Sequence, residues 1–393
     1  MDREDRQLSL VERWELDIES YKKGASVLTS TPQCEECKFH IKKNALHCDK
    51  FCKESKPKFV MFPSKECPEF VHKNPLIIKI ENQFDEMVYS GILGFCIGDA
   101  LGVPVEFTSR EERKTDPIEE MRGYGTYHQH FGTWSDDTSL LLCLMDCINE
   151  SYNLKRLSEK FIKFYLEAYL TPNGEVFDIG VSTRESIEKM IKGIEPEDCG
   201  GCTEMDNGNG SLMRVLPLAY YVKSFSSEKR KETIEQVSSL THSHKRSKLA
   251  CIFYVEFLIG LINKKSKIDA YSTAVDFVKN YCFIDYEKEF INFEKILNGK
   301  IIGVEEKEIK STGYVIDTLE ASIWSFFKGN DYKEVVLTSI NLGGDTDTIA
   351  AIAGGLAGVY YGLESIPIPW KECLARNKEI CKIIDDFIKT VSI

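Results

Sequence analysis

Residues 341–358 read NLGGDTDTIAAIAGGLAG. The stretch opens with a glycine turn, continues with two aspartates that are each followed by threonine, and ends in a run of small residues. Small residues let a helix approach its neighbours closely. Carboxylate and hydroxyl oxygens at the start of such a helix suit Mg²⁺ or Mn²⁺ better than zinc. An ordinary N-cap would explain one of these side chains but not the pair. The stretch therefore predicts a central helix with a divalent-metal site at its mouth.

A second acidic opening lies upstream, where residues 132–138 read GTWSDDT and precede an apolar helix expected over residues 139–148. Adjacent carboxylates repel each other, so keeping both ionised in a partly buried site requires a cation nearby. The helix dipole also favours acidic residues in a first turn, and simple capping is the alternative explanation. Because two such openings occur in one chain, together they predict the ligands of a two-metal site.

The rest of the chain, from about residue 83 to 393, has a sequence pattern typical of helices. Apolar residues recur at helical spacing, as at Leu140, Leu141, Leu144, Met145 and Ile148, and few segments alternate as strands do. A chain of 393 residues that is 42% hydrophobic can bury a large core. The pattern predicts one all-α domain over residues 83–393.

Charge and cysteine content narrow the classes of function. The formal net charge of -12 argues against a general polyanion-binding surface. A phosphate-bearing ligand must then be held by helix N-termini, backbone amides or cations. The start of the chain is charged where a secretory signal would be apolar, and we expect no bilayer-spanning run. These features predict a cytoplasmic protein without a membrane partner, in which the 14 cysteines stay reduced.

The N-terminal part divides into a charged arm over residues 1–27 and a cysteine-rich module over residues 28–75. So short a segment has too little apolar content to fold unaided, and a Cys-x₂-Cys pair with two further cysteines can wrap one tetrahedral ion. We expect structural zinc, with Cys52 or a histidine as a substitute ligand; an iron–sulfur cluster is the alternative, and cysteines that are merely buried or free are the other. The module should recruit or orient a target. The expected zinc ligands are Cys34, Cys37, Cys48 and Cys67.

Glycines at positions 91, 94 and 98 fall on one face of a helix, which predicts tight helix packing rather than a phosphate loop. Asp99 is expected to be a structural hydrogen-bonding residue at the end of that helix. Glu106 lies beyond Pro104 on an expected loop, where it could reach a metal or a catalytic water. From the residues alone, a solvated Glu106 is the better interpretation.

Three weaker signals follow. The loop from Asn207 to Ser211 can present amides to phosphate, although one glycine-rich loop is a weak indication. From the residues alone, His242 and His244 are better explained as ordinary core or surface histidines than as ligands. The segment from Cys199 to Cys202 is interpreted as a loop of no special role, because no thioredoxin-like setting surrounds it.

Taken together, these motifs resemble the ADP-ribosylglycohydrolases, a family that includes the dinitrogenase-reductase-activating glycohydrolase and the animal ADP-ribosyl-acceptor hydrolases. The similar stretches occur in the family's order over residues 90–360. They are GDALG at 98–102 with Glu106, WSDDT at 134–138, NGSLMR at 209–214, Thr241 with His242, and GGDTDT at 343–348 with the helix after it.

The resemblance implies an all-α orthogonal bundle around a cleft that holds two Mg²⁺ or Mn²⁺ ions. By resemblance, Glu106 is a mobile carboxylate near the metals, and Asn209, Gly210, Ser211 and His242 contact ADP-ribose. Ser135 replaces the threonine common at its position, but a hydroxyl is retained. Glu106, Asp136 and Asp345 are the candidate catalytic residues. The implied metal ligands are Ser135, Asp136, Asp137, Asp345, Asp347 and Thr348.

The implied reaction is hydrolysis of the bond at the anomeric carbon of the distal ribose, which releases ADP-ribose from a modified macromolecule. We expect this macromolecule to be a protein. Two metal ions would grip the ribose hydroxyls and polarise a water, and Glu106 or an aspartate ligand would take its proton. A two-metal phosphohydrolase and a silent ADP-ribose-binding protein are the alternatives. Arginine, serine and nucleic-acid adducts present the same ribose; we favour arginine, with selectivity set by the rim, including residues 110–130.

Overall fold

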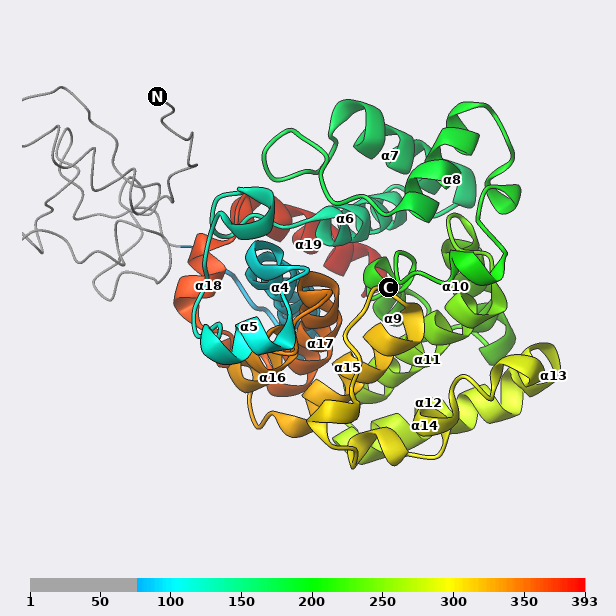
Figure 1. Ribbon diagram of the computed structural model, residues 1–393. Coiled ribbons are helices and arrows are strands. Elements are labelled where there is room, and N and C mark those ends of the chain that lie inside the picture. Colours follow the sequence, from blue (N-terminus) through cyan, green and yellow to red (C-terminus); the bar gives the residue numbers. More distant parts are fainter. Residues whose placement is uncertain (1–75, 393) are drawn as a thin grey trace, which may run out of the picture.

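The computed structural model describes residues 76–392, so the arm and the cysteine-rich module, with Cys34, Cys37, Cys48 and Cys67, lie outside the described residues. The described chain is a bundle of helices (Figure 1). Several begin with a side-chain N-cap, for example Asn153, Ser226 and Asp331. The helices are α4 (Gln83–Gly102), α5 (Arg110–Thr115), α6 (Asp136–Asn149), α7 (Leu154–Glu167), α8 (Val181–Ile191), α9 (Leu218–Tyr221), α10 (Ser227–Ser239), α11 (Lys245–Ile262), α12 (Lys267–Tyr281), α13 (Phe283–Tyr286), α14 (Glu294–Leu297), α15 (Val315–Lys328), α16 (Tyr332–Ile340), α17 (Thr346–Tyr361), α18 (Ile368–Cys373) and α19 (Asn377–Val391).

The all-α prediction is confirmed for this part of the chain. Over residues 76–392, β-type pairing is limited to three isolated bridges, which join Tyr124 to Gln129, Gly201 to His242, and Gly208 to Tyr314. The last two bridges fasten loops next to the acidic helix openings. They position loops rather than build a sheet.

Helices α4 and α17 form the centre of the bundle and lie side by side (Figure 1). Their backbones are in direct contact, because a Cβ at Gly94 would lie 2.6 Å from the carbonyl oxygen of Gly354, and one at Gly98 would lie 2.1 Å from that of Ala350. Any side chain at these positions would push the helices apart. The face of small residues therefore packs as the sequence predicts.

The two central helices run antiparallel, so the end of α4 meets the start of α17. Gly102, the last residue of α4, is so close to α17 that a Cβ would lie 2.3 Å from the Cα of Asp347. Beyond α4, the amide of Phe107 donates to the carbonyl of Gly344 at 2.7 Å, and the amide of Gly344 donates to Thr108 at 2.8 Å. This pairing brings Glu106 beside the turn that carries the aspartates of α17.

The expectation that no run of the chain is long and apolar enough to span a bilayer is wrong. The segment Gln83–Val105, which contains α4, is long and apolar enough to cross a bilayer by length and composition. Its apolar window is completely buried inside the protein, as the central helix of a bundle must be.

Candidate active site

Three carboxyl groups meet where α4 ends and α17 begins. Oxygen atoms of Glu106, Asp345 and Asp347 lie within 4.8 Å of one another, and all three side chains are buried. Glu106 is only 4% exposed, so its interpretation as a solvated side chain is wrong. The antiparallel packing of α4 against α17 buries it, which is a tertiary effect that a loop sequence does not reveal.

The start of α6 adds Asp136 and Asp137, whose side chains are 3% and 2% exposed. Ser135 is the N-cap of α6, and its hydroxyl accepts a hydrogen bond from the amide of Asp137 at 3.2 Å. The charge of Asp345 acts on both aspartates, which places the two acidic openings in one electrostatic environment. The two openings, 210 residues apart in the numbering, therefore share one site.

The metal-free site resists ionisation. Burial, followed by the charges of Asp178 and Asp345, raises the pKa of Glu106 to about 10. Burial likewise raises the pKa values of Asp136, Asp137 and Asp347 well above the usual range, and neighbouring carboxylates add to the effect. Carboxyl groups collected in this way are stable as anions when a cation neutralises them.

The donor set fits hard divalent cations. Four buried carboxylate oxygens have no hydrogen-bond partner: Oε2 of Glu106, Oδ2 of Asp137, Oδ1 of Asp345 and Oδ2 of Asp347. An unpaired buried polar atom is costly, and a cluster of such oxygens matches the ligand type that Mg²⁺ and Mn²⁺ prefer. Thr348 is also buried here, and its amide donates to Oδ1 of Asp347 at 2.8 Å.

The glycine-rich loop of residues 207–211 reaches this site through Asn209. The Asn209 side chain donates to Oδ2 of Asp345 at 2.7 Å and to the Thr318 hydroxyl at 3.0 Å. Buried Arg214 supports the loop from behind, since it donates to the carbonyl of Gly210 at 2.5 Å and to that of Val237 at 2.9 Å. Asn209 thus orients a carboxylate of the cluster.

His242 and Ser211 lie under the same loop. The ring of His242 is buried against Gly210, where a Cβ would lie 2.8 Å from Cε1, and its Nδ1 is 2.8 Å from the Thr241 hydroxyl. Burial, followed by the charge of Arg214, lowers the pKa of His242 to about 3, so the ring is neutral at physiological pH. The Ser211 hydroxyl accepts from Ser238 at 3.0 Å inside the core, so its side chain packs within the protein.

Asp178 belongs to the site, although sequence reasoning missed it. It lies on the loop between α7 and α8, and its charge acts on Glu106, Asp136, Asp137 and Asp347. Its φ of +59° is in the left-handed region, which aspartate tolerates better than most residues. An aspartate directly before Ile179-Gly180 and the start of α8 is a third acidic helix opening, and that pattern was the available signal.

Tyr127 is the second residue that sequence reasoning missed. Its hydroxyl donates to Oδ1 of Asp178, and its ring lies 5.2 Å from that of Phe177. It comes from the stretch of residues 110–130, which was expected to contribute to the rim. No local pattern marks one tyrosine in that stretch as special, because its partner lies 51 residues away.

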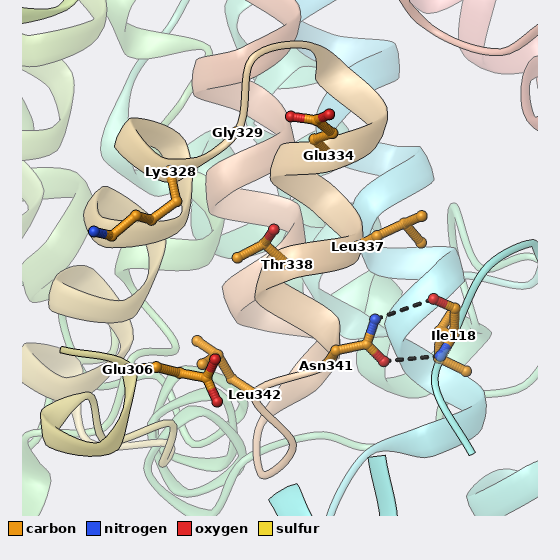
Figure 2. A pocket seen from close by; sticks show the side chains of 9 residues that line it. All are labelled: Ile118, Glu306, Lys328, Gly329, Glu334, Leu337, Thr338, Asn341 and Leu342. Atoms are coloured by element: carbon orange, nitrogen blue, oxygen red, sulfur yellow. Dashed lines mark hydrogen bonds between the residues drawn. The ribbon is translucent and has the colours of Figure 1, made fainter. Parts of the chain in front are cut away.

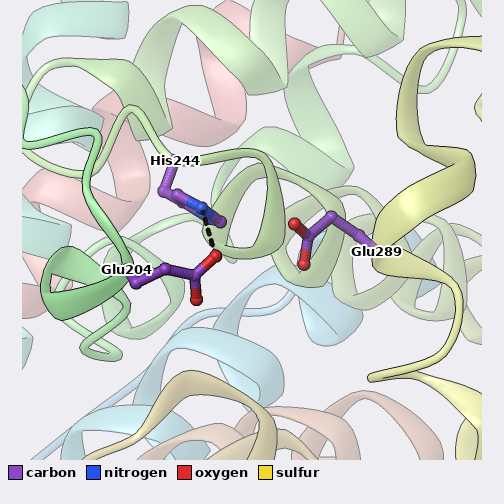
Figure 3. Close-up of side chains that lie close together, drawn as sticks. All are labelled: Glu204, His244 and Glu289. Carbon is purple, nitrogen blue, oxygen red and sulfur yellow. Dashed lines mark ion pairs between the residues drawn. The ribbon is translucent and has the colours of Figure 1, made fainter.

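A second acidic group, Glu204, His244 and Glu289, lies outside this site (Figure 3). Arg246 already neutralises it, since Nη1 lies 2.9 Å from Glu204 and Nε lies 2.7 Å from Glu289. His244 is the N-cap of α11. This group is an ion-pair network that joins loops.

Two cysteines lie in the nearby segment of residues 199–202. Cys199 is buried and Cys202 is exposed, and both are free thiols.

A groove of about 430 Å³ runs along α16 (Figure 2). At one end, the Asn341 side chain donates to the carbonyl of Ile118 at 3.0 Å and accepts from its amide at 2.8 Å. The lining contains none of the acidic residues described above. It consists of Ile118, Glu306, Lys328, Gly329, Glu334, Leu337, Thr338, Asn341 and Leu342.

Comparisons with known proteins identify the family of the chain. The sequence model of the ADP-ribosylglycohydrolase family matches residues 81–392. The chain is 30% identical over 325 residues to the ADP-ribosylarginine hydrolase Tri1 of Serratia proteamaculans, covering 81% of this chain and 83% of that protein. It is 27% identical over 302 residues to the ADP-ribosyl-[dinitrogen reductase] glycohydrolase of Rhodospirillum rubrum, covering 75% and 92%.

A solved structure described as an ADP-ribosylglycohydrolase-related protein complex superposes with a TM-score of 0.65 and 25% identity, covering 79% of this chain and 99% of that one. The family match over residues 81–392 includes all the helices from α4 to α19. The chain belongs to the ADP-ribosylglycohydrolase family and is a hydrolase of glycosidic bonds.

Proposed function

We propose that this enzyme removes ADP-ribose from arginine side chains of modified proteins in a reaction that depends on Mg²⁺. The observation that carries the proposal is the convergence of buried carboxyl groups with four unpartnered oxygens at one end of α4 and α17. The arginine linkage is supported by the relatives named ADP-ribosylarginine hydrolase, which are 30% identical to this chain.

The residues that would hold two Mg²⁺ or Mn²⁺ ions come from the two helix openings. Bound there, the ions would neutralise the carboxylates and polarise the hydroxyls of the distal ribose. The protein contributes rigidity, since Asn209 orients Asp345 at 2.7 Å and the Thr348 amide orients Asp347 at 2.8 Å. The proposed ligands are Ser135, Asp136, Asp137, Asp345, Asp347 and Thr348.

The diphosphate of ADP-ribose would bind between the start of α8 and the glycine-rich loop. The first amides of a helix have no partner within the helix, and they favour anions. Thr183 in the first turn of α8 is 1% exposed, and its hydroxyl has no partner. That hydroxyl faces the loop, since a Cβ at Gly210 would lie 2.8 Å from it. This arrangement supplies phosphate donors in a chain with a net charge of -12.

Proton transfer would be the work of Glu106 or of one of the aspartates. Glu106 and Asp178 interact with each other, an oxygen of Glu106 lies within 4.8 Å of oxygens of Asp345 and Asp347, and Oε2 of Glu106 has no hydrogen-bond partner. A carboxylate in this position can accept a proton from the attacking water as the bond to the anomeric carbon breaks. The departing arginine takes up a proton, and ADP-ribose is the product.

The test is hydrolysis of a panel of defined substrates that carry ADP-ribose on arginine, on serine and on an oligonucleotide. We expect release of free ADP-ribose from the arginine peptide with Mg²⁺, and none with EDTA. Release from serine or nucleic acid alone would overturn the linkage, and release that persists in EDTA would overturn the metal requirement. Binding of ADP-ribosylated peptide without release would contradict the enzyme.

We further propose that the cysteine-rich module of residues 28–75 holds zinc and recruits the target. The support is the spacing of its cysteines in the sequence. Protein purified without oxygen should be colourless and contain about one zinc per chain, whereas iron with sulfide, or no metal, would contradict the assignment. Deletion of residues 1–75 should spare turnover of small substrates, because the family match begins at residue 81.

A further inference from the structure

One tyrosine hydroxyl binds a carboxyl group of the active site and lies close to a second. Tyr127 donates its hydroxyl proton to Oδ1 of Asp178, and the Glu106 carboxyl is close enough to interact with the same hydroxyl oxygen. A phenol has one proton to donate and lone pairs that accept. It can therefore bridge one group that accepts and another that donates.

The two carboxyl groups come from different parts of the chain. Glu106 and Asp178 approach from different loops, and their side chains are close enough to interact with each other. Both side chains belong to segments that the helices position only indirectly, since Glu106 follows the short helix Val103–Val105 and Asp178 precedes α8. The position of one carboxyl group relative to the other therefore depends on the contacts between the two loops.

The short helix that carries Tyr127, Gly125–Tyr127, is fixed tightly on the Glu106 side. The Thr126 hydroxyl donates to the backbone carbonyl of Glu106 at 2.8 Å. Gly125 has a φ of +51°, and a Cβ there would lie 1.7 Å from the carbonyl oxygen of Pro104, so the chain accepts no side chain at this point. The short helix is therefore held in a fixed position relative to the backbone of Glu106.

The same loop is also fixed on the Asp178 side. The Tyr127 ring lies 5.2 Å from the Phe177 ring, and Gln129 donates to the Glu175 carboxylate at 2.7 Å. Asn173 in turn donates to the side-chain oxygen of Gln129 at 2.9 Å. Residues 125–129 are thus a connection between the loop of Glu106 and the loop of Asp178, and the Tyr127 hydroxyl is its contact with the reactive groups.

We propose that Tyr127 is a positioning residue of the hydrolysis, whose hydroxyl holds Asp178 beside Glu106 in the arrangement that the reaction requires. The inference rests on the proposed function, because it needs both carboxyl groups to act on one reacting centre. Loss of the hydroxyl removes the bridge and leaves the ring packing in place. The consequence is a slower reaction step rather than weaker substrate binding.

The test compares the Tyr127→Phe and Tyr124→Phe variants of the full chain, with Mg²⁺ and the ADP-ribosylated arginine peptide. Tyr124 is the matched control, since its hydroxyl lies in the same loop and contacts the exposed His130 at 3.2 Å. Tyr127→Phe should lower kcat roughly 10- to 100-fold, as loss of a supporting hydrogen bond does, with KM unchanged. Tyr124→Phe should leave kcat unchanged.

A double-mutant cycle with Asp178→Asn separates positioning from general structure. If the hydroxyl acts through Asp178, adding Tyr127→Phe to Asp178→Asn should cost less than about twofold more. The inference is wrong if Tyr127→Phe has the wild-type kcat. It is also wrong if Tyr127→Phe lowers kcat as much in the Asp178→Asn variant as in the wild type, or if the fall in kcat is accompanied by a lower Tm. If the wild-type protein releases no ADP-ribose, the proposed function itself is wrong. If the wild type is active and Tyr127→Phe is unaffected, only the role of Tyr127 is wrong.

Discussion

The Asp99 carboxylate of α4 accepts two hydrogen bonds from Thr138 of α6, one from its amide at 3.0 Å and one from its hydroxyl at 2.6 Å. Its other oxygen accepts from the amide of Ser135 at 2.9 Å. Asp99 is fully buried, and it serves as the N-terminal anchor of α6 from a neighbouring helix. The expectation that Asp99 is a structural residue is confirmed. Its hydrogen bonds fix the start of α6 and thereby position Asp136 and Asp137.

Asp99→Asn should therefore destabilise the fold by about 2 kcal/mol, because an amide group would face a donor and leave buried groups unpaired. Urea denaturation measures the difference. Asp386→Asn is the control, since Asp386 forms an exposed ion pair with Lys389 and should change stability by less than about 0.5 kcal/mol. Equal stability of the two variants would contradict the anchoring role.

Asp136→Asn and Asp347→Asn should each reduce turnover by at least about 100-fold while the protein stays folded, since even groups that only support metal ligands matter about 10- to 100-fold. Both aspartates are buried among carboxyl groups that repel them. Each variant should consequently be as stable as the metal-free wild type, or more so, by thermal denaturation in EDTA. A folded double variant with a near-normal rate would exclude the two-metal site.

Glu106→Gln should lower kcat about 100-fold and leave the affinity for ADP-ribose nearly unchanged, because it removes a proton acceptor and keeps the shape of the side chain. Steady-state kinetics and calorimetric titration with ADP-ribose give the two quantities. An equal loss of binding with no loss of rate would show that Glu106 contacts the ligand and does not act in the reaction.

Mg²⁺ should bind more tightly as the pH rises. The metal-free carboxyl groups have raised pKa values, that of Glu106 at about 10, so protons compete with the cation. For an acid whose folded pKa is raised, the folded state holds more protons, and the stability of the metal-free protein falls as pH rises above the unfolded value. The Tm difference between Mg²⁺ and EDTA should thus be larger at pH 9 than at pH 6, whereas a constant difference would contradict the competition.

The buried neutral His242 should make the protein less stable in acid. The pKa of His242 in the folded state is lowered to about 3. Below about pH 6.5 the ring is therefore protonated in the unfolded state but stays neutral in the folded state. Stability contributed by the neutral ring is complete above that pH, and roughly 2 kcal/mol should be lost by pH 5. Urea denaturation at pH 7 and pH 5 measures the loss. His242→Gln should lack this part of the slope, and parallel slopes would show that His242 titrates normally.

Local patterns in the sequence were sufficient for the helical class and for the two acidic helix openings. Helical spacing, the glycine face of residues 91, 94 and 98, and the aspartates before α6 and α17 are properties of short segments, and the structure has them where the sequence predicts them. Such features follow from backbone geometry and side-chain size within a few turns of helix.

Tertiary structure alone decided which loop residues join those aspartates. The antiparallel contact of α4 with α17 buries Glu106, the packing of loops 51 residues apart brings Tyr127 to Asp178, and the Ser211 hydroxyl turns into the core. Each of these positions depends on which helices pack together and on how far they are shifted along their axes relative to one another. A loop side chain carries no periodic signal of its own, so its surroundings are determined only when distant segments come into contact.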